Sequence, residues 1–497
     1  MSFTPQQLAT AIGGRCARGV DSACAETAPI AGRVVHDSRQ VQPGDVFWAL
    51  RGTRQRGTDF IDDALARGAV GAVTDVVGIQ PPPGRWVITV QDAYESFVQA
   101  ARWQRDRFTG RVVAVTGSVG KTTARQMIDA VLSHRLTGTA TARNYNNHVG
   151  VPLSMLAWKP NDNYAVVELG ASATGEIAML AEWCRPHVAV ITRLGDAHLG
   201  TFGSRDAIDT AKAELLDALP DDGLAVLNAD DARVRRIAAR SPARIAWVGE
   251  SVFADVRASH VFAGPGSLQF TVDGHRFDVP VWGRHHLGSA LSAVAIGRHF
   301  GLNLREIAYG LAEFRAPEMR CEVRAWRGAT VINDCYNSSP LAVRAALELL
   351  QNIETSGRRV ILLGDMCDLG NEAVVLHRRA AEDAVTIGRA DMLIACGRYA
   401  SQMVEAARRI GLPPTDAIAS DVRSAIEIIR QHLTPGDVLL IKGSRVMALE
   451  RVMRTLEETS SRVGQTFLSA EARTTDGRQE CLPHQDAQLV DARYSVA

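Results

Sequence analysis

The stretch RVVAVTGSVGKTTARQMIDAVL, residues 111–132, decides the fold of this chain. Residues 112–115 form an apolar run typical of a buried strand, and the residues from Lys121 onward have the apolar spacing of a helix. Between them lies a short loop that contains Gly117 and Gly120 and ends at Lys121 and Thr122. A strand, a glycine-containing loop and a helix opening with Lys-Thr are typical of a nucleotide-binding P-loop.

Each residue type in this loop suits the binding of phosphate. Glycines let backbone N–H groups approach phosphate oxygens, and the helix N-terminus favours negative charge. The lysine reaches the outer phosphates and the threonine hydroxyl is a ligand for Mg²⁺. The strict pattern is not met, because Val115 stands at the first glycine position, and a tight strand-to-helix turn is the alternative. We therefore expect nucleotide binding by Thr116, Gly117, Ser118, Val119, Gly120, Lys121 and Thr122.

The length and charge of the chain limit the number of domains and the kinds of protein that it can be. A chain of 497 residues suggests about three domains. Lys and Arg total 55, as do Asp and Glu, so the net charge is zero, which argues against a general nucleic-acid binder. No apolar run approaches the ~18 residues of a membrane span, and the N-terminus lacks a signal-peptide pattern. The eight cysteines contain no CxxC pair, as expected in a reducing compartment. A cytoplasmic location without membrane insertion is the expectation.

Apolar runs alternating with helical patterns indicate an α/β fold of three domains. We expect a small α/β domain over residues 1–108 and a central P-loop ATPase domain with a mainly parallel sheet over residues 109–318. A second α/β series predicts a Rossmann-like domain over residues 319–459. Residues 460–497 lose all periodicity, and we expect a flexible tail there.

Three later residues are candidates for a metal site. Glu168 and His198 follow apolar runs, so they are expected at the carboxyl edge of the sheet, beside the P-loop. Lys212 lies in a helical stretch and is one of only four lysines, against 51 arginines. An ammonium group beside Mg²⁺ would be repelled, whereas a neutral amine can become a carbamate that offers oxygen to the metal. Taken singly, each residue has a plainer explanation as a solvated polar side chain.

An ordered set of motifs resembles the Mur ligase family from about residue 30 to 458. The set runs through HDSRQVQPGDVFWALRG (36–52), TGSVGKTT (116–123), NYNNHVGVP (144–152), VVELGAS (166–172), GDAHLGTFGS (195–204), AKAELL (211–216), LNADD (227–231), GRHH (283–286), NDCYNSSP (333–340), LLGDMCDLG (362–370) and IKGSR (441–445). Any one match is weak, but their order is specific.

The resemblance implies an ATP-dependent ligase of peptidoglycan precursor synthesis. Within the family, residues 333–340 and 362–370 are most similar to the branch that joins D-alanyl-D-alanine to UDP-N-acetylmuramoyl-tripeptide. ATP would phosphorylate the peptide carboxylate, and the dipeptide amine would attack the resulting acyl phosphate. The resemblance further implies small-molecule substrates and a monomer.

The resemblance also implies roles for particular residues. Lys121, His198, Lys212 and Arg320 would be catalytic, and Ser289, Arg320 and Asp334 would join the P-loop in binding ATP. Two Mg²⁺ ions would be held by Thr122, Glu168, His198 and carbamylated Lys212. Asp37, Ser38 and Arg39 would face the uridine nucleotide, and Asn146, Asn147 and Asn337 the sugar–peptide part of the substrate.

Several positions depart from the family pattern. His286 and Ser289 stand where the family has asparagines, the second of which contacts adenine, and Arg193 stands where it usually has another asparagine. Lys442 fits a structural contact as well as a substrate role. A sister ligase with a different amine substrate is the main alternative, and a nucleotide-binding protein without ligase activity is a further one. Phosphate release with different amines would separate them.

Overall fold

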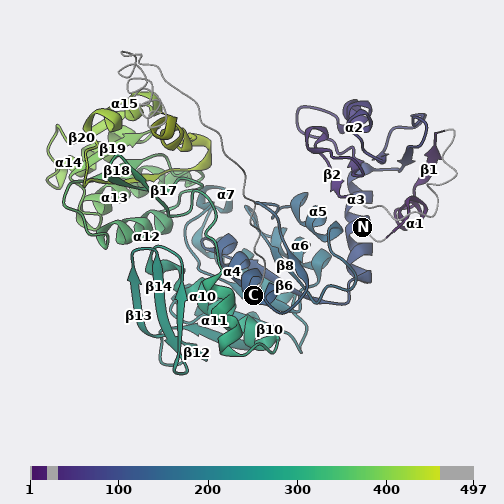
Figure 1. Ribbon diagram of the computed structural model, residues 1–497, viewed down its shortest axis with the longest axis horizontal. Helices are drawn as coiled ribbons and strands as arrows, with labels where there is room; N and C mark the ends of the chain where they lie inside the picture. The colour runs from purple at the N-terminus through teal and green to yellow at the C-terminus, as the bar shows by residue number, and fades with distance from the viewer. Residues whose placement is uncertain (1–2, 20–31, 459–497) are drawn as a thin grey trace, which may run out of the picture.

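The computed structural model describes residues 3–19 and 32–458, which form three α/β domains (Figure 1). This confirms the fold class predicted from the sequence. The expected tail, residues 460–497, lies outside the described residues. None of the helices in the described ranges is both long and apolar enough to cross a membrane.

The N-terminal domain is built on a five-stranded sheet with the order β1-β5-β4-β3-β2. Its strands are β1 (Arg15–Arg18), β2 (Val34–Val35), β3 (Val46–Trp48), β4 (Gly71–Thr74) and β5 (Trp86–Thr89), and β1 alone is antiparallel to its neighbour. The helices are α1 (Pro5–Ala11), α2 (Ile61–Ala66) and α3 (Ala93–Arg107).

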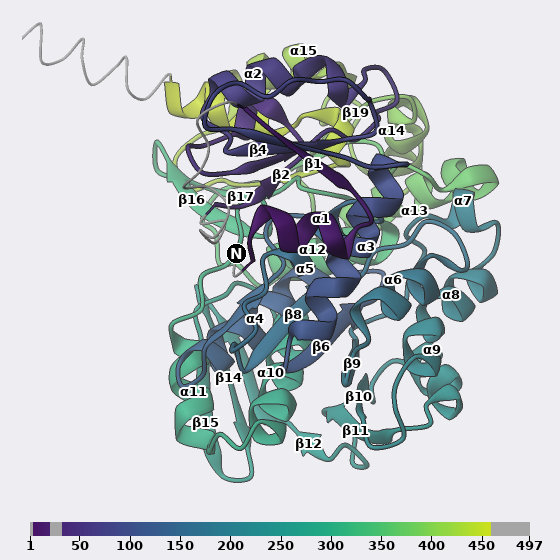
Figure 2. The same ribbon diagram turned by 90° about the vertical axis from the view of Figure 1, so that its right-hand side faces the viewer.

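Helix α3 connects this domain to the central one (Figure 2). Its buried face includes Phe97, which packs edge-on against Trp48 of the N-terminal sheet. Near its other end, Arg105 donates from Nε to the carbonyl of Cys184, at 2.7 Å, in the central domain. One continuous apolar core therefore spans both domains.

The central domain has a seven-stranded sheet in the order β12-β11-β10-β9-β6-β8-β7, with every pair parallel. The strands are β6 (Arg111–Thr116), β7 (Gly138–Ala140), β8 (Tyr164–Glu168), β9 (Val188–Ile191), β10 (Leu224–Asn228), β11 (Arg244–Gly249) and β12 (Val256–Arg257). A three-stranded antiparallel sheet follows, of β13 (Ser259–Gly264), β14 (Ser267–Val272) and β15 (His275–Val279). The helices are α4 (Lys121–Ser133), α5 (Gly150–Leu156), α6 (Glu176–Cys184), α7 (Leu199–Phe202), α8 (Arg205–Asp217), α9 (Ala232–Ile237), α10 (Leu287–His299) and α11 (Leu304–Ala312).

The inner strands β6, β8, β9 and β10 are mostly apolar and almost entirely buried because the sheet is covered on both faces. Residues 112–115 of β6 alternate between two cores: Val112 and Ala114 face one, and Val113 and Val115 face the other. Helix α4 packs on the second core together with α10. The P-loop between β6 and α4 is therefore fixed at both of its ends.

The C-terminal domain has a six-stranded sheet in the order β16-β17-β21-β18-β19-β20, in which only β16 is antiparallel. Its strands are β16 (Glu322–Trp326), β17 (Ala329–Asp334), β18 (Arg359–Leu363), β19 (Met392–Cys396), β20 (Ala417–Ser420) and β21 (Val438–Lys442). Its helices include α12 (Pro340–Gln351), α13 (Ala373–Thr386), α14 (Ala400–Arg409) and α15 (Val422–His432), and residues 450–458 are helical as well. The central strand β21 ends at Lys442 beside the end of β17 at Asp334.

Candidate functional site

A cavity of about 780 Å³ lies where the central and C-terminal domains meet. Residues 118–123 of the P-loop line it from the central domain, and Arg320, Asp334 and Lys442 line it from the C-terminal domain. The carboxyl ends of parallel strands from two sheets therefore open into one space, which is where α/β proteins bind ligands.

The P-loop has a backbone that only glycine adopts easily at two points. Gly117 has φ 144°, and a Cβ atom there would lie 2.2 Å from Oγ1 of Thr192. Gly120, the N-cap of α4, has φ 84°. Thr192 follows β9 and donates from Oγ1 to the carbonyl of Val119 at 2.6 Å. The loop is thus held against β9, and its N–H groups and the start of α4 border the cavity.

Lys121 folds over this loop. Its Nζ donates to the carbonyl of Gly117 at 2.8 Å, and burial lowers its pKa. Arg320 lies close enough that its charge adds to the lowering, while Glu168 opposes it. The ammonium group is therefore placed where an anionic ligand on the loop would meet it.

Glu168 is the buried carboxylate of the site. It ends β8, and its Oε2 accepts a hydrogen bond from Oγ1 of Thr122 at 2.9 Å. Its Oε1 accepts one from Nδ2 of Asn146 at 2.8 Å, and Nε of Arg125 lies 3.6 Å from Oε2. The predicted pair Thr122 and Glu168 is therefore in direct contact, and its oxygens are the hard donors that Mg²⁺ prefers. This donor set fits a magnesium ion.

His198 and Lys212 are the other two predicted metal ligands, and only His198 is among the residues that line the cavity. His198 is the N-cap of α7, with φ 62°, and its Nδ1 lies 3.0 Å from Oδ2 of Asp368 in the C-terminal domain. Burial lowers the pKa of His198, and the charges of Lys121 and Lys212 lower it further. His198 lines the cavity.

Lys212 projects from α8 and is only 3% exposed. Its Nζ donates to the carbonyl of Ala171, at 3.3 Å, which itself lines the cavity. Burial lowers the pKa of Lys212 to about 7, so a large fraction of the amine is neutral at neutral pH. A neutral amine is the form that reacts with CO₂, so the side chain fits the carbamate predicted from the sequence.

Two cationic side chains of the C-terminal domain complete the site. Arg320 donates to Oγ1 of Thr122 at 3.1 Å and its guanidinium lies 4.3 Å from the centre of the Tyr336 ring. Lys442, 1% exposed, lies 2.7 Å from Oδ2 of Asp334 and also donates to that residue's carbonyl. These contacts hold Lys442 and Asp334 together at the wall of the cavity, which both residues line.

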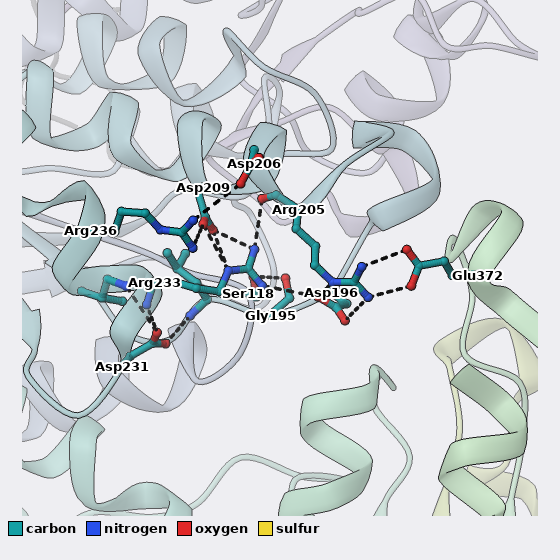
Figure 3. A network of polar contacts seen from close by, with 12 residues as sticks. Ser118, Gly195, Asp196, Arg205, Asp206, Asp209, Asp231, Arg233, Arg236 and Glu372 are labelled. Carbon is teal, nitrogen blue, oxygen red and sulfur yellow. Dashed lines mark hydrogen bonds and ion pairs between the residues drawn. The ribbon is translucent and has the colours of Figure 1, made fainter. Parts of the chain in front are cut away.

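A polar network fixes the loop that leads to His198 (Figure 3). Arg205 bridges Asp196 of this loop, at 3.0 Å, and Glu372 of the C-terminal domain, at 2.7 Å. Arg233 contacts Asp196 at 3.3 Å, and Ser118 of the P-loop donates to the carbonyl of Gly195 at 3.0 Å. The network therefore joins the P-loop, the His198 loop and the C-terminal domain.

The remaining predicted residues fall into three groups. Ser289, Asn146, Asn147 and Asn337 line the cavity. Thr116 is fully buried behind the loop, where its hydroxyl donates to the carbonyl of Leu169 at 2.8 Å.

Asp37, Ser38 and Arg39 lie in the N-terminal domain and are not among the lining residues of this cavity. Asp37 accepts a hydrogen bond from Nε of Arg39 at 2.9 Å, and this bond lowers the pKa of Asp37 to about 2.

Sequence reasoning missed four residues of the site. Asp368 lies within the quoted stretch 362–370 but was given no role, and Tyr336 lies within 333–340. Arg125 and Thr192 contact Glu168 and the P-loop. For Arg125, its position one helical turn after Lys121 was the available signal.

The fold and the cavity define a P-loop protein of three α/β domains. Residues 32–102, 115–297 and 319–445 match, in that order, the Mur ligase family catalytic domain, the Mur ligase middle domain and the Mur ligase glutamate ligase domain. The chain is 34% identical over 437 residues to the UDP-N-acetylmuramoyl-tripeptide--D-alanyl-D-alanine ligase of Escherichia coli, covering 86% of this chain and 94% of that one. It is 30% identical over 429 residues to the Bacillus subtilis enzyme of the same name, covering 86% and 93%.

Solved structures give the same result. A crystal structure of MurF from Acinetobacter baumannii matches with a TM-score of 0.80 and 29% identity, over 92% of this chain and 99% of that one. MurF from Thermotoga maritima in complex with ADP matches with a TM-score of 0.73 and 27% identity, over 86% and 98%. The chain belongs to the Mur ligase family, which confirms the resemblance found in the sequence.

Proposed function

We propose that this protein joins D-alanyl-D-alanine to UDP-N-acetylmuramoyl-tripeptide with ATP, in cytoplasmic peptidoglycan precursor synthesis for cell-wall growth and division. The names of its relatives support this substrate pair. The observation that carries the proposal is the convergence of Glu168 and Arg320 on Thr122, at a cavity between two domains that Lys121 also lines. We further propose a monomer with domain boundaries near residues 109 and 318.

The residues divide the chemistry between them. The amides of residues 117–120 and Lys121 bind the phosphates of ATP, and Arg320 offsets the charge that develops as the terminal phosphate moves to the peptide carboxylate. Asp334 accepts hydrogen bonds from the ribose. The acyl phosphate is then attacked by the amine of the dipeptide, and phosphate leaves.

Magnesium is part of the proposal. Thr122 and Glu168 would hold one ion, and His198 with a carbamate on Lys212 would hold the second. When bound, the ions withdraw charge from the phosphate oxygens. Asn146 orients Glu168. Three residues of the N-terminal domain bind the uridine nucleotide: Asp37, Ser38 and Arg39. Asn147 and Asn337 face the sugar–peptide part of the substrate.

The test is phosphate release in the presence of ATP, Mg²⁺ and UDP-N-acetylmuramoyl-tripeptide. We expect release with D-alanyl-D-alanine and little with single amino acids. Release with a single amino acid instead would establish a sister ligase. Binding of ATP and of the UDP-precursor without release for any amine would establish a nucleotide-binding protein without ligase activity.

A further inference from the structure

Two histidines and one cysteine gather at the junction of the central and C-terminal domains. His285 and His286 belong to the turn just before α10, whereas Cys321 lies at the start of β16. One ligand atom from each of the three lies within 4.8 Å of the other two. In the part of the chain that the structure describes, this is the cluster of His, Cys, Asp and Glu whose atoms are close enough to share an ion.

The spacing matches that of a tetrahedral thiolate–imidazole metal site. Sγ of Cys321 lies 3.6 Å from Nε2 of His285. Bond lengths of about 2.3 Å to sulfur and about 2.0 Å to nitrogen at a tetrahedral angle place the two ligand atoms about 3.5 Å apart. The centroids of the His285 and His286 rings are 4.0 Å apart. The ring of His286 therefore lies next to that of His285, within reach of the same ion.

The surroundings select against a hard cation. Thiolate and imidazole are ligands for zinc and similar ions, while Mg²⁺ requires oxygen donors. The charge of Asp334 acts on His285 against the positive charges of Lys442 and Arg193. The choice of ion therefore rests on the ligand types.

The backbone conformation around Cys321 fixes the direction of its side chain. Met319 and Cys321 both have positive φ, 57° and 51°, which is uncommon for residues with a side chain. The amide of Cys321 donates to Oδ1 of Asp334 at 3.2 Å. Such a conformation persists only where the surroundings hold it, so the direction of the thiol is determined by the fold.

We propose that His285, His286 and Cys321 form a binding site for Zn²⁺ or a similarly soft divalent ion. It leaves one coordination position open toward the nucleotide cavity, which all three residues line. Because His285 and His286 come from the central domain and Cys321 from the C-terminal domain, a bound ion ties the two domains together at the wall of the cavity. This site goes beyond the ligase function and needs neither of the two Mg²⁺ ions.

The test uses the full chain, stripped of metal with a chelator and kept reduced, without nucleotide or peptide substrate. Co²⁺ serves as the spectroscopic probe and Zn²⁺ as the competitor, in direct titrations. We expect a thiolate-to-cobalt charge-transfer band in the near ultraviolet, with one equivalent bound, and its loss on adding Zn²⁺. Since no substrate is present, the result is independent of whether the ligase activity is found.

Variants identify the ligands. Cys321→Ser abolishes the band, and Cys367→Ser, at an exposed cysteine away from the cluster, retains it. His286→Asn keeps a side chain of similar size and lowers Zn²⁺ affinity by more than tenfold, since even loss of an outer-shell partner costs about 10–100-fold. Circular dichroism checks that each variant is folded. If Cys321→Ser does not fold, the Zn²⁺ affinity of His286→Asn tests whether the cluster binds the ion. Absence of the band in the wild type, or its survival in Cys321→Ser, would leave the contact as a simple S–H···N hydrogen bond and overturn the proposal.

Discussion

Nδ1 of His198 lies 3.0 Å from Oδ2 of Asp368, across the boundary between the central and C-terminal domains. A carboxylate can only accept, so the imidazole donates from Nδ1 and leaves the lone pair of Nε2 free. Histidines that bind metals commonly make this second contact, which fixes the tautomer and the direction of the ring. Asp368 is thus a positioning residue for the metal ligand that we propose at His198.

Asp368→Asn should therefore weaken the response to Mg²⁺. We expect the Mg²⁺ concentration for half-maximal activity to rise by about tenfold or more, with a smaller change in the KM for ATP. The matched control is Glu372→Gln, which removes the ion pair with Arg205 across the same boundary and keeps the contact of His198 with Asp368. An equal shift in both variants would mean that Asp368 acts on domain docking and not on the histidine.

Lys121→Ala tests the P-loop. Because the ammonium group is placed over the loop and its charge would stabilise the transferred phosphate, we expect kcat to fall by about 10²-fold or more. The melting temperature should stay within a few degrees, since the side chain bonds only loop carbonyls. Lys159→Ala, at an exposed lysine, is the control. Near-normal phosphate release by Lys121→Ala would refute the assignment of the loop.

Variants of Tyr336 test whether its ring positions Arg320 of the C-terminal domain for ATP. The guanidinium stacks on the ring at 4.3 Å, a contact worth about 0.5–1 kcal/mol. Tyr336→Phe retains the ring and should behave like the wild type, while Tyr336→Leu should lower kcat/KM for ATP about twofold to fivefold. If the phenylalanine variant falls as far as the leucine variant, the hydroxyl and not the stacking is what matters.

The sequence predicts local features well and contacts between distant segments poorly. The runs that became β6, β8, β9 and β10 were predictable because strands covered on both faces are apolar throughout. Glu168 was predicted to lie beside the P-loop because it ends a strand of the same parallel sheet, and the resemblance paired it with Thr122; the two side chains are in contact. The contact of His198 with Asp368 was not predictable, because 170 residues separate them and the domains' docking decides it.

The pair Lys442 and Asp334 shows the same limit within one domain. Both residues end apolar runs, and the sequence places each at a strand end. Only the strand order β17-β21-β18, with a crossover between non-consecutive strands, makes them partners. Short strands with few apolar residues, such as β7, carry no such signal.

Lys212→Arg tests the carbamate. Arginine keeps the charge but stays protonated and cannot react with CO₂, so we expect almost complete loss of ligase activity. Lys212→Ala should also be inactive and should regain part of its activity when acetate is added, because a carboxylate restores the oxygen ligand. Activity of Lys212→Arg close to the wild type would show that the side chain is only a buried lysine.

The stability of the folded protein should depend on pH through the same lysine. Its pKa is about 7 in the folded state against the ordinary 10.5, so between these values the unfolded state binds more protons. The free energy of unfolding therefore rises with pH through this window, and the cost of burying the amine is largest below about pH 7.

Lys212→Met removes this cost. We expect the variant to gain stability over the wild type near neutral pH, and the difference to shrink as the pH approaches 10.5. Urea unfolding at several pH values measures the free energy of unfolding of both proteins. The buffer is degassed and free of bicarbonate, because CO₂ would convert the amine into a carbamate. Lys159→Met, at an exposed lysine, should show no such trend. A stability difference for Lys212→Met that does not change with pH would mean that the amine is not held neutral by its burial in α8.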